Sequence, residues 1–316
     1  MRMAKKNERL QVNALPKGYQ LPEYSIEKPI SEGGFSIVYL AIHIPTRKRV
    51  VIKEFFPIKY AQRISTGRVE TLNEEASRSY GLGIKRFFNE GSALAKINHQ
   101  NVVHVTHLFR ANNTVYMVMD FEVGRDMRWY IKRKNGNLSE KFLRTVFPEV
   151  LSGVKELHDN HILHLDIKPA NILLRAGGHP LLIDFGAVKH LKGDANLEVK
   201  GHTLTQGFAP IEQHNHGNIG PWTDIYAIGA TMRACIEGQS PVSAKDRDIK
   251  DKLRPAVSAF KRRYSQSLLE AIDWAMEMDP LLRPQNVDEF LEAFEKEEKV
   301  ESSLLGRVMG TLNKPL

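Results

Sequence analysis

The segment HLDIKPAN, residues 164–171, constrains this chain most, because it sets a carboxylate, a cation and a carboxamide at fixed offsets. The three groups belong to Asp166, Lys168 and Asn171. A short apolar run over 181–183 then leads directly into Asp184, Phe185 and Gly186. The pattern indicates a base, a cation and metal ligands brought into one site. Taken alone, HLDIKPAN also fits ordinary surface residues in a helix-to-strand loop, and the rest of the chain must decide.

Further segments extend this pattern in a fixed order. They are SEGGFSIV at 31–38, VVIK at 50–53, EGSALAKINHQNVV at 90–103, GFAPIEQ at 207–213, DIYAIGA at 224–230 and DPLLRP at 279–284. In this order the chain resembles the eukaryotic-like Ser/Thr protein kinase family over roughly residues 24–296. The phrases SEGGFSIVYLA, IKEFFP and GFAPIEQ resemble its bacterial branch. The resemblance implies an α+β fold of two lobes, a β-rich N-lobe with one main helix and a mostly α-helical C-lobe.

The same resemblance implies the catalytic roles. Asp166 would accept the proton of a substrate hydroxyl, and Lys168 would lie over the transferring phosphoryl group. Asn171 and Asp184 would hold Mg²⁺ beside the phosphates of ATP, with Mn²⁺ as an alternative ion. The form D-x-K-P-x-N implies Ser or Thr as the acceptor.

The strand VVIK ends in Lys53, which resembles the family's lysine that reaches the α- and β-phosphates. A buried lysine without a partner loses its charge, so an acidic partner is required. We predict Glu90, because apolar residues follow it at helical spacing. Glu74 and Glu75 are the alternatives, although they lie in a polar stretch with no apolar stripe.

The expected phosphate-binding loop departs from the pattern G-x-G-x-x-G-x-V. Serines stand at two of its three glycine positions, and each gives up the freedom in φ that glycine has. The loop residues predicted to contact the nucleotide are Ser31, Gly33, Gly34, Ser36 and Val38. The resemblance further implies Met119 as gatekeeper and a hinge over Asp120 to Glu122 whose backbone binds adenine.

Two segments of the second half distinguish protein kinases from small-molecule phosphotransferases. GFAPIEQ supplies Glu212, and DPLLRP supplies Arg283 as its expected buried partner. A bidentate pair of this kind is strongest when it is shielded from water. The resemblance also predicts that Asp224 braces the backbone of the catalytic loop and that Thr205 contacts Asp166 and Lys168.

Leu165 replaces the arginine of the family motif H-R-D. Arg pairs bidentately with phosphate and Leu does not, so we predict that activation does not depend on a phosphate held at this position. Thr203, Thr205 and Thr223 are candidate phosphorylation sites, and Thr203 is preferred because Thr205 is assigned to the active site.

Composition agrees with a folded chain that buries a large core. Its 316 residues are 42% hydrophobic and 26% charged, without an apolar run long enough to span a membrane. The N-terminus has no apolar signal core, and the single Cys235 suits a reducing cytoplasm.

We predict a polar N-terminal extension over 1–20, the N-lobe and hinge over 21–122, the C-lobe over 123–296 and a tail over 297–316.

The net charge of +8 raises the question of nucleic-acid binding. Basic residues are scattered, and no aromatic platform is interleaved with them, so no nucleic-acid partner is expected. The expected partners are ATP and proteins with Ser or Thr acceptors. The 54–89 insertion, which is predicted to hold a small hairpin around Thr66 and Gly67, is one candidate site for a regulator. The apolar stripe of the tail is the other, although docking of the tail on its own C-lobe is preferred.

Three functions are consistent with the sequence. The first is an active Ser/Thr protein kinase that uses ATP and Mg²⁺, including phosphorylation of itself. The second is a pseudokinase scaffold that binds nucleotide or partners without turnover, suggested by Ser31, Ser36 and Leu165. The third is a small-molecule phosphotransferase of kinase-like fold, which GFAPIEQ with Arg283 argues against.

Overall fold

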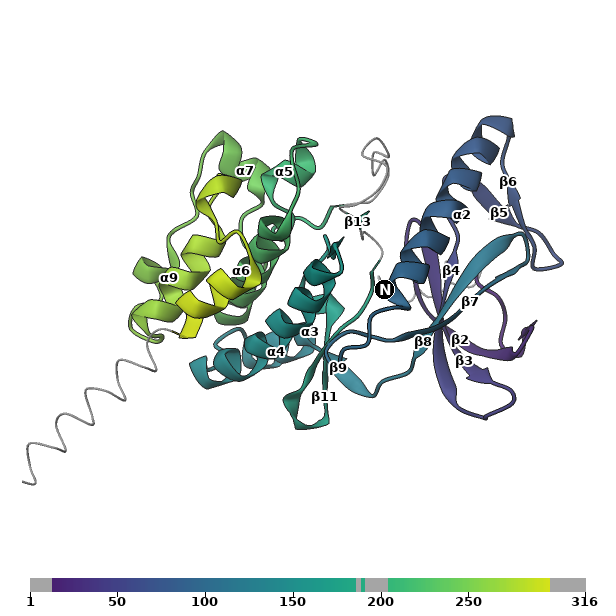
Figure 1. Cartoon of the computed structure of the whole chain (residues 1–316), viewed down its shortest axis with the longest axis horizontal. Helices are drawn as coiled ribbons and strands as arrows, with labels where there is room; N and C mark the ends of the chain where they lie inside the picture. Colours follow the sequence, from purple (N-terminus) through teal and green to yellow (C-terminus); the bar gives the residue numbers. More distant parts are fainter. Residues whose placement is uncertain (1–12, 186–188, 191–203, 296–316) are drawn as a thin grey trace, which may run out of the picture. The chain divides into compact units, whose positions relative to one another are not determined.

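The computed structural model describes residues 13–185, 189–190 and 204–295 (Figure 1). The described residues form two compact units, one that ends at Val123 and one that begins at Gly124. Each unit has its own sheet and its own helices. Three features singled out in the sequence, Gly186, Thr203 and the tail over 297–316, lie outside the described residues.

The first unit is built on an antiparallel six-stranded sheet in the order β1-β2-β3-β4-β8-β7. The strands are β1 (Gln20–Leu21), β2 (Tyr24–Glu32), β3 (Ser36–His43), β4 (Arg49–Phe55), β8 (Thr114–Asp120) and β7 (Val105–Ala111). The β-branched and aromatic runs of β3, β4 and β8 suit a pleated, buried surface. β8 is buried at every position from Thr114 to Met119, so both faces of the sheet are covered at its centre.

One face of this sheet is covered by α2 (Glu74–Leu94), which contacts β4, β7 and β8 (Figure 1). Asn73 caps the helix, its side chain accepting a hydrogen bond from the N–H of Ala76. The helix begins at Glu74, well before Glu90, within a stretch whose polar residues predict no helix. Its buried positions include small residues such as Ala76 and Gly91, which conceal the apolar stripe in the sequence.

The insertion between β4 and α2 contains a two-stranded hairpin, β5 (Ala61–Arg63) and β6 (Val69–Thr71). Gly67 has φ +87° in the connecting turn, a conformation that glycine adopts without strain. The predicted hairpin around Thr66 and Gly67 is therefore confirmed. Residues 13–20, predicted as part of a polar extension, belong to the folded unit, because Leu15 is buried and its N–H donates to the hydroxyl of Tyr39.

The second unit is mostly helical. Its longer helices are α3 (Met127–Lys134), α4 (Glu140–Asp159), α6 (Pro221–Glu237) and α9 (Gln266–Ala275), and its shorter ones are α5 (Ile211–His214), α7 (Ala244–Ile249) and α8 (Ala256–Ala259). Every residue of α6 from Thr223 to Ile236 is buried, so this helix forms the centre of the core. It begins with proline at its first position and ends at Gly238, whose φ is +89°.

Short β-strands flank the loops of the second unit that contain the candidate site residues. β9 (Gly124–Asp126), β11 (Ile172–Arg175) and β12 (Pro180–Leu182) form a sheet in the order β12-β11-β9, and β10 (Ile162–Leu163) pairs with β13 (Lys189–His190). The segment HLDIKPAN therefore connects β10 to β11, and β12 leads into Asp184. The two units match the predicted fold class, with a β-rich N-terminal unit that has one main helix and a mostly helical C-terminal unit.

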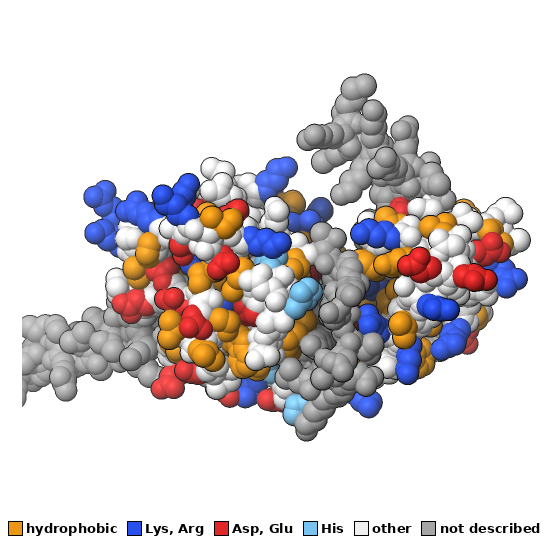
Figure 2. Space-filling view, turned by 90° about the horizontal axis from the view of Figure 1, so that it is seen from above, with side chains coloured by type: hydrophobic (Ala, Val, Ile, Leu, Met, Phe, Trp, Pro, Cys, Tyr) orange, Lys and Arg blue, Asp and Glu red, His pale blue; other side chains and the backbone are white. Residues whose placement is uncertain are grey.

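The surface of each unit carries charges of both signs. Figure 2 shows Lys and Arg side chains beside Asp and Glu on both units, with apolar side chains between them. Such mixing is typical of solvated faces. Within the part of the chain that the structure describes, no helix is both long and apolar enough to cross a membrane.

Candidate active site

Asp166, Lys168 and Thr205 form a closed set of hydrogen bonds in the second unit. The ammonium of Lys168 lies 2.9 and 2.7 Å from the two carboxylate oxygens of Asp166 and donates to the Thr205 hydroxyl at 2.8 Å. The Thr205 hydroxyl in turn donates to Oδ1 of Asp166 at 2.8 Å. The predicted contact of Thr205 with both residues is confirmed. Asp166 and Lys168 remain partly accessible to solvent, so a substrate can approach them.

Asn171 joins this cluster from the 3-10 helix η1 (Pro169–Asn171). Its side-chain nitrogen donates to the backbone oxygen of Asp166 at 2.8 Å and to Oδ2 of its carboxylate at 3.0 Å. The side chain is buried, and its orientation is set by these two bonds. The amide nitrogen is thus directed to Asp166, and the amide oxygen is the atom left for a cation.

The backbone on both sides of the cluster has an unusual conformation. Leu165 has φ +62° and Asp184 has φ +64°, values that residues other than glycine seldom adopt. Each such residue costs about 1–3 kcal/mol and persists only where the surrounding structure holds it. The Leu165 side chain is buried, and Gln213 donates to its carbonyl oxygen at 3.0 Å.

Asp224, at the start of α6, binds the backbone of the loop that carries Asp166. Its two carboxylate oxygens accept the backbone N–H groups of His164 at 2.9 Å and Leu165 at 2.8 Å. Nε2 of His158 lies 2.8 Å from the same carboxylate. Burial by itself raises the pKa of Asp224, but the hydrogen bond and charge of His158 and the contacts with His164 outweigh it and lower the pKa. The predicted brace of the loop backbone by Asp224 is confirmed.

His164 fills the core behind the loop. Its ring lies 4.8 Å from the ring of Phe185, the residue after Asp184. Burial lowers the pKa of His164, although the carboxylates of Asp224, Asp166 and Asp184 act in the opposite direction. A neutral imidazole that packs on Phe185 connects the catalytic loop to the segment that carries Asp184.

Glu212 and Arg283 form the predicted buried pair. The guanidinium donates to both carboxylate oxygens, at 2.7 and 3.1 Å, and both side chains are buried. The remaining donors of Arg283 reach the backbone oxygens of Glu277 and Met278, and its guanidinium lies 4.8 Å from the ring centre of Tyr226.

The hydroxyl of Thr223 donates to Glu212. This pairing satisfies the buried charges and makes Thr223, itself buried, a poor phosphorylation site.

The expected phosphate-binding loop connects β2 to β3 in the first unit. The N–H of Gly33 donates to the carbonyl of Ser36 at 2.8 Å and closes the turn. No residue of 31–36 has a positive φ, so Ser31 and Ser36 cause no backbone strain here. Val38 follows in β3, where it pairs with Lys53 of β4.

Lys53 and Glu90 lie on β4 and α2, two elements of the same unit that pack together. Lys53 is buried. Its cross-strand neighbour in β8 is Met117, and Met117 approaches Gly91, the residue after Glu90. Glu74 and Glu75 are exposed in the first turn of α2, where acidic groups complement the helix dipole. Sixteen positions (90 − 74) separate Glu74 from Glu90, about 24 Å along a helix.

The predicted adenine-binding residues lie where β8 ends. Met119 is buried in β8, and Asp120 closes the strand with an exposed side chain. Glu122 is exposed in the connection that follows. The structure thus gathers the predicted nucleotide residues in the first unit and the predicted catalytic and metal residues in the second.

Some functional side chains were missed by sequence reasoning. His158 and Gln213 support the catalytic loop, and Glu54 and Arg63 support the sheet that carries Lys53. The spacing LHDNHILHLD offered only a weak signal for His158, because several histidines occur together. Glu54 directly follows Lys53, and nothing in the sequence marks it as buried. The structure shows that it is completely buried, and a buried carboxylate requires a partner.

Comparison with known proteins agrees with this geometry. The family model for the protein kinase domain matches residues 24–294, which is most of the chain. The chain therefore belongs to the protein kinase family.

Relatives and solved structures lead to the same family. Serine/threonine-protein kinase D of Synechocystis sp. is 28% identical over 86% of this chain and 52% of its own length. PrkC of Bacillus subtilis is 26% identical over 84% of this chain and 39% of its own length. The structure of PpkA-294 in its apo form is 33% identical, with a TM-score of 0.78, over 90% of this chain and 100% of that chain. The chain spans about half the length, or less, of the curated relatives.

Proposed function

We propose that this chain is an ATP-dependent Ser/Thr protein kinase that transfers the γ-phosphoryl group of ATP to Ser and Thr hydroxyls of proteins, itself included. The observation that carries the proposal is the hydrogen-bonded cluster of Asp166, Lys168 and Thr205, in a chain of the protein kinase family. The buried pair of Glu212 and Arg283 supports a protein acceptor over a small molecule.

In this mechanism Asp166 orients the acceptor hydroxyl and takes its proton as the oxygen attacks the γ-phosphorus. Lys168, which is held against Asp166, faces the transferring phosphoryl group. Its positive charge stabilises the negative charge of that group in the transition state. Thr205 keeps the carboxylate and the ammonium in register by bridging them. Preorganisation of this kind lowers the barrier because the groups need no rearrangement during the reaction.

The family uses ATP with a divalent cation. Asn171 and Asp184 are the residues that would hold it, and their oxygen donors fit Mg²⁺ as a hard ion. Mg²⁺ usually takes one or two protein carboxylates and completes its shell with phosphates and water. When bound, the ion neutralises charge on the β- and γ-phosphates.

The nucleotide half of the proposal uses residues of the first unit. The loop with Ser31, Gly33, Gly34 and Ser36 would meet the phosphates, with Val38 over the adenine. Met119 would line the adenine pocket, and the backbone from Asp120 to Glu122 would bind its edge. Lys53 would reach the α- and β-phosphates, oriented by Glu90.

The strand register supports the pairing of Lys53 with Glu90. Phe55, two positions after Lys53, contacts Phe87 and Tyr80 of α2. Since alternate residues of a strand share a face, Lys53 also faces α2. A cation buried on that face is retained in its charged form only beside an acidic group.

A cytoplasmic location belongs to the proposal as well. The single cysteine, Cys235, is buried in α6, and burial raises the pKa of its thiol. A lone buried thiol is the usage expected in a reducing compartment. For protein partners, the proposal is a regulator that binds the insertion over 54–89 or the tail.

Phosphoryl transfer provides the test. The full chain is incubated with radiolabelled ATP and Mg²⁺, alone and with a basic protein acceptor, and label is analysed as phosphoserine and phosphothreonine. Asp184→Ala and Lys53→Ala serve as matched variants whose fold is checked by circular dichroism. We expect label with the wild type and its loss in both variants.

Two results would contradict the proposal. Nucleotide binding by thermal shift with no transfer to any protein would favour the scaffold function suggested by Ser31, Ser36 and Leu165. Transfer to sugars or choline but never to protein would favour the small-molecule phosphotransferase.

A further inference from the structure

The phosphate-binding loop is held by backbone hydrogen bonds from the insertion that follows β4. The ladder between β3 and β4 continues past Lys53 to the pair of Ser36 and Phe55. Beyond it, the N–H of Phe56 donates to the carbonyl of Phe35 at 2.8 Å, and the N–H of Ile58 donates to the carbonyl of Gly34 at 3.2 Å. The tip of the loop is therefore attached to the first residues of the insertion.

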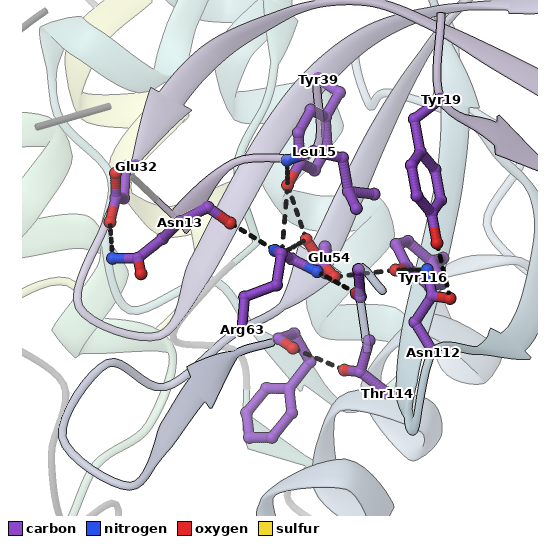
Figure 3. A network of polar contacts seen from close by, with 12 residues as sticks. Asn13, Leu15, Tyr19, Glu32, Tyr39, Glu54, Arg63, Asn112, Thr114 and Tyr116 are labelled. Atoms are coloured by element: carbon purple, nitrogen blue, oxygen red, sulfur yellow. Dashed lines mark hydrogen bonds and ion pairs between the residues drawn. The ribbon is translucent and has the colours of Figure 1, made fainter. Parts of the chain in front are cut away.

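The stem of the same loop is held from the N-terminal side of the unit. The side-chain nitrogen of Asn13 donates to Oε1 of Glu32, the last residue of β2, at 3.0 Å (Figure 3). The backbone oxygen of Asn13 accepts a hydrogen bond from Nε of Arg63 in β5. Leu15, two residues on, is 1% exposed and anchors this segment in the core. Asn13 thus links the loop to the hairpin.

Arg63 is anchored by a buried carboxylate on the reverse side of β4. Its guanidinium lies 2.6 Å from Oε2 of Glu54, whose side chain is fully buried. The hydroxyls of Tyr39 and Tyr116 also donate to Glu54, at 2.7 and 2.8 Å (Figure 3). Because side chains alternate across a strand, Glu54 points away from the face that Lys53 occupies. The network therefore lies on the face of the sheet opposite to Lys53 and supports β4 from that face.

We infer that Asn13 and Arg63 are positioning residues that hold the phosphate-binding loop for ATP, through Glu32 and through the insertion. The inference rests on the proposed kinase function. A loop fixed at its stem and at its tip loses less conformational freedom when the nucleotide binds, so less binding free energy is spent on ordering it. In a chain with serines at two glycine positions, attachment to the rest of the unit sets the loop's conformation.

The ordinary alternative is that these contacts only stabilise the fold. A purely structural role predicts a lower melting temperature with unchanged nucleotide affinity. A positioning role predicts weaker nucleotide binding and a higher KM for ATP with little change in kcat, since Asp166 and Lys168 are untouched.

The first experiment uses Asn13→Ala, which removes the donor to Glu32 and keeps the backbone bond to Arg63. The probes are the Kd for Mg-ADP by calorimetry and the KM and kcat for ATP with the full chain. We expect Kd and KM to rise about three- to tenfold, the equivalent of one ordinary hydrogen bond, because the bond between Asn13 and Glu32 is only partly buried, with kcat within about twofold. Gln20→Ala is the control, because the Gln20 side chain donates to the backbone oxygen of Gly18 and the hydroxyl of Ser25, away from the loop.

Glu32 allows the hydrogen bond to be separated from charge. Glu32→Gln keeps an acceptor for Asn13 but removes the negative charge, whereas Glu32→Ala removes both. We expect tighter Mg-ADP binding in Glu32→Gln than in Glu32→Ala. Asn13→Ala should add no further loss in the Glu32→Ala background. Equal affinities of the two Glu32 variants, or additive losses, would overturn the role of this bond.

Arg63 requires a paired substitution, because its loss alone would leave the Glu54 charge buried without a cation. Glu54→Gln with Arg63→Met removes both charges and keeps a carbonyl oxygen as acceptor for one of the two tyrosine hydroxyls, while the amide nitrogen can donate to the other. We expect faster hydrogen exchange at the amides of Phe56 and Ile58, together with a Kd for Mg-ADP raised by a similar factor. Faster hydrogen exchange at these amides with a wild-type Kd for Mg-ADP would show that the network only stabilises the fold, and would overturn the inference.

Failure of the inference and failure of the kinase function give different results. A wild-type chain that transfers phosphoryl groups while all these variants keep its Kd and KM overturns the inference alone. A wild-type chain that binds Mg-ADP but transfers nothing overturns the kinase function, and the Kd measurements still decide the inference. A wild-type chain that binds no nucleotide overturns both.

Discussion

At the scale of single residues, the site depends on a few side chains whose orientation is set by their neighbours. The carboxylate of Asp166 is contacted by Lys168, Asn171 and Thr205 within 3.0 Å. The strained backbone of Leu165 is retained because Asp224 and Gln213 bind its N–H and its carbonyl. Leu165 is itself buried, so it fills space where the family's motif has a cation for phosphate.

Thr205→Ala should lower kcat by about 10- to 100-fold, the equivalent of losing hydrogen bonds to charged partners. The variant removes the hydroxyl that bridges Lys168 and Asp166. Steady-state transfer to a protein acceptor measures the effect, and Thr205→Ser, which keeps the hydroxyl, should retain most of the activity. A serine variant as slow as the alanine variant would argue against the bridge.

His164 should make stability depend on pH. Its folded pKa is lowered by burial from the ordinary value of 6.5, so below that pH the unfolded chain binds a proton that the folded chain does not. Its contribution to stability is full above pH 6.5 and is lost as the pH falls toward the folded pKa. The slope is at most about 1.4 kcal/mol per pH unit.

Urea unfolding at pH 7 and pH 5.5 checks this expectation in the wild type and in His164→Leu. The wild type should lose more unfolding free energy between the two pH values than the variant does. An equal loss in both proteins would show that the imidazole stays charged, or that it titrates alike in the folded and unfolded states.

At the scale of elements, α2 is set close to the sheet by its small residues. A Cβ at Gly83 would lie 2.4 Å from Cζ of Phe55, whereas a Cβ at Gly81 would have no atom within 4 Å outside the helix. Neither glycine has a positive φ. The close approach at Gly83 brings α2 onto β4, the strand that carries Lys53.

These two glycines form a matched pair for substitution. Gly83→Ala should destabilise the chain by about 1–3 kcal/mol through overpacking against Phe55. Gly81→Ala should instead stabilise it by about 0.5–1 kcal/mol, because alanine is the better helix former. Chemical denaturation measures both. Stabilisation by Gly83→Ala would show that α2 lies farther from β4 than the structure indicates.

At the scale of the whole molecule, the buried groups that support the fold are distinct from the groups proposed to perform the chemistry. Glu212 and Arg283 are 71 positions apart and satisfy each other in the core of the second unit. Asp166 and Lys168 remain partly open to solvent. Activity and stability should therefore respond to different substitutions.

Arg283→Ala should cost about 3–5 kcal/mol of unfolding free energy, because it leaves Glu212 buried without its cation. Asp166→Ala should cost less unfolding free energy than Arg283→Ala, because Asp166 and its partner Lys168 are partly open to solvent, and should still abolish transfer. Denaturation and activity of both variants provide the comparison. An unchanged melting temperature in Arg283→Ala would contradict the buried pair.

Several contacts of the candidate site could be predicted because the residues involved occur in short, local patterns. HLDIKPAN, the strand before Asp184 and the segment GFAPIEQ each hold their side chains within one loop or turn, so the resemblance to the kinase family is enough to name them. The predicted contacts of Thr205, Asp224 and the Glu212–Arg283 pair are confirmed for the same reason: each joins two recognisable segments.

The start of α2 and the partner of Glu54 could not be predicted. The apolar face of α2 is interrupted by small residues, whose burial depends on the sheet they touch. Glu54 and Arg63 are paired by the direction in which β4 and β5 present their side chains. Local sequence determined the chemical groups and their order, and through the family resemblance the pairing of Glu212 with Arg283. Only the tertiary structure decided that Glu54 meets Arg63, because that contact depends on strand register and on how β4 and β5 pack.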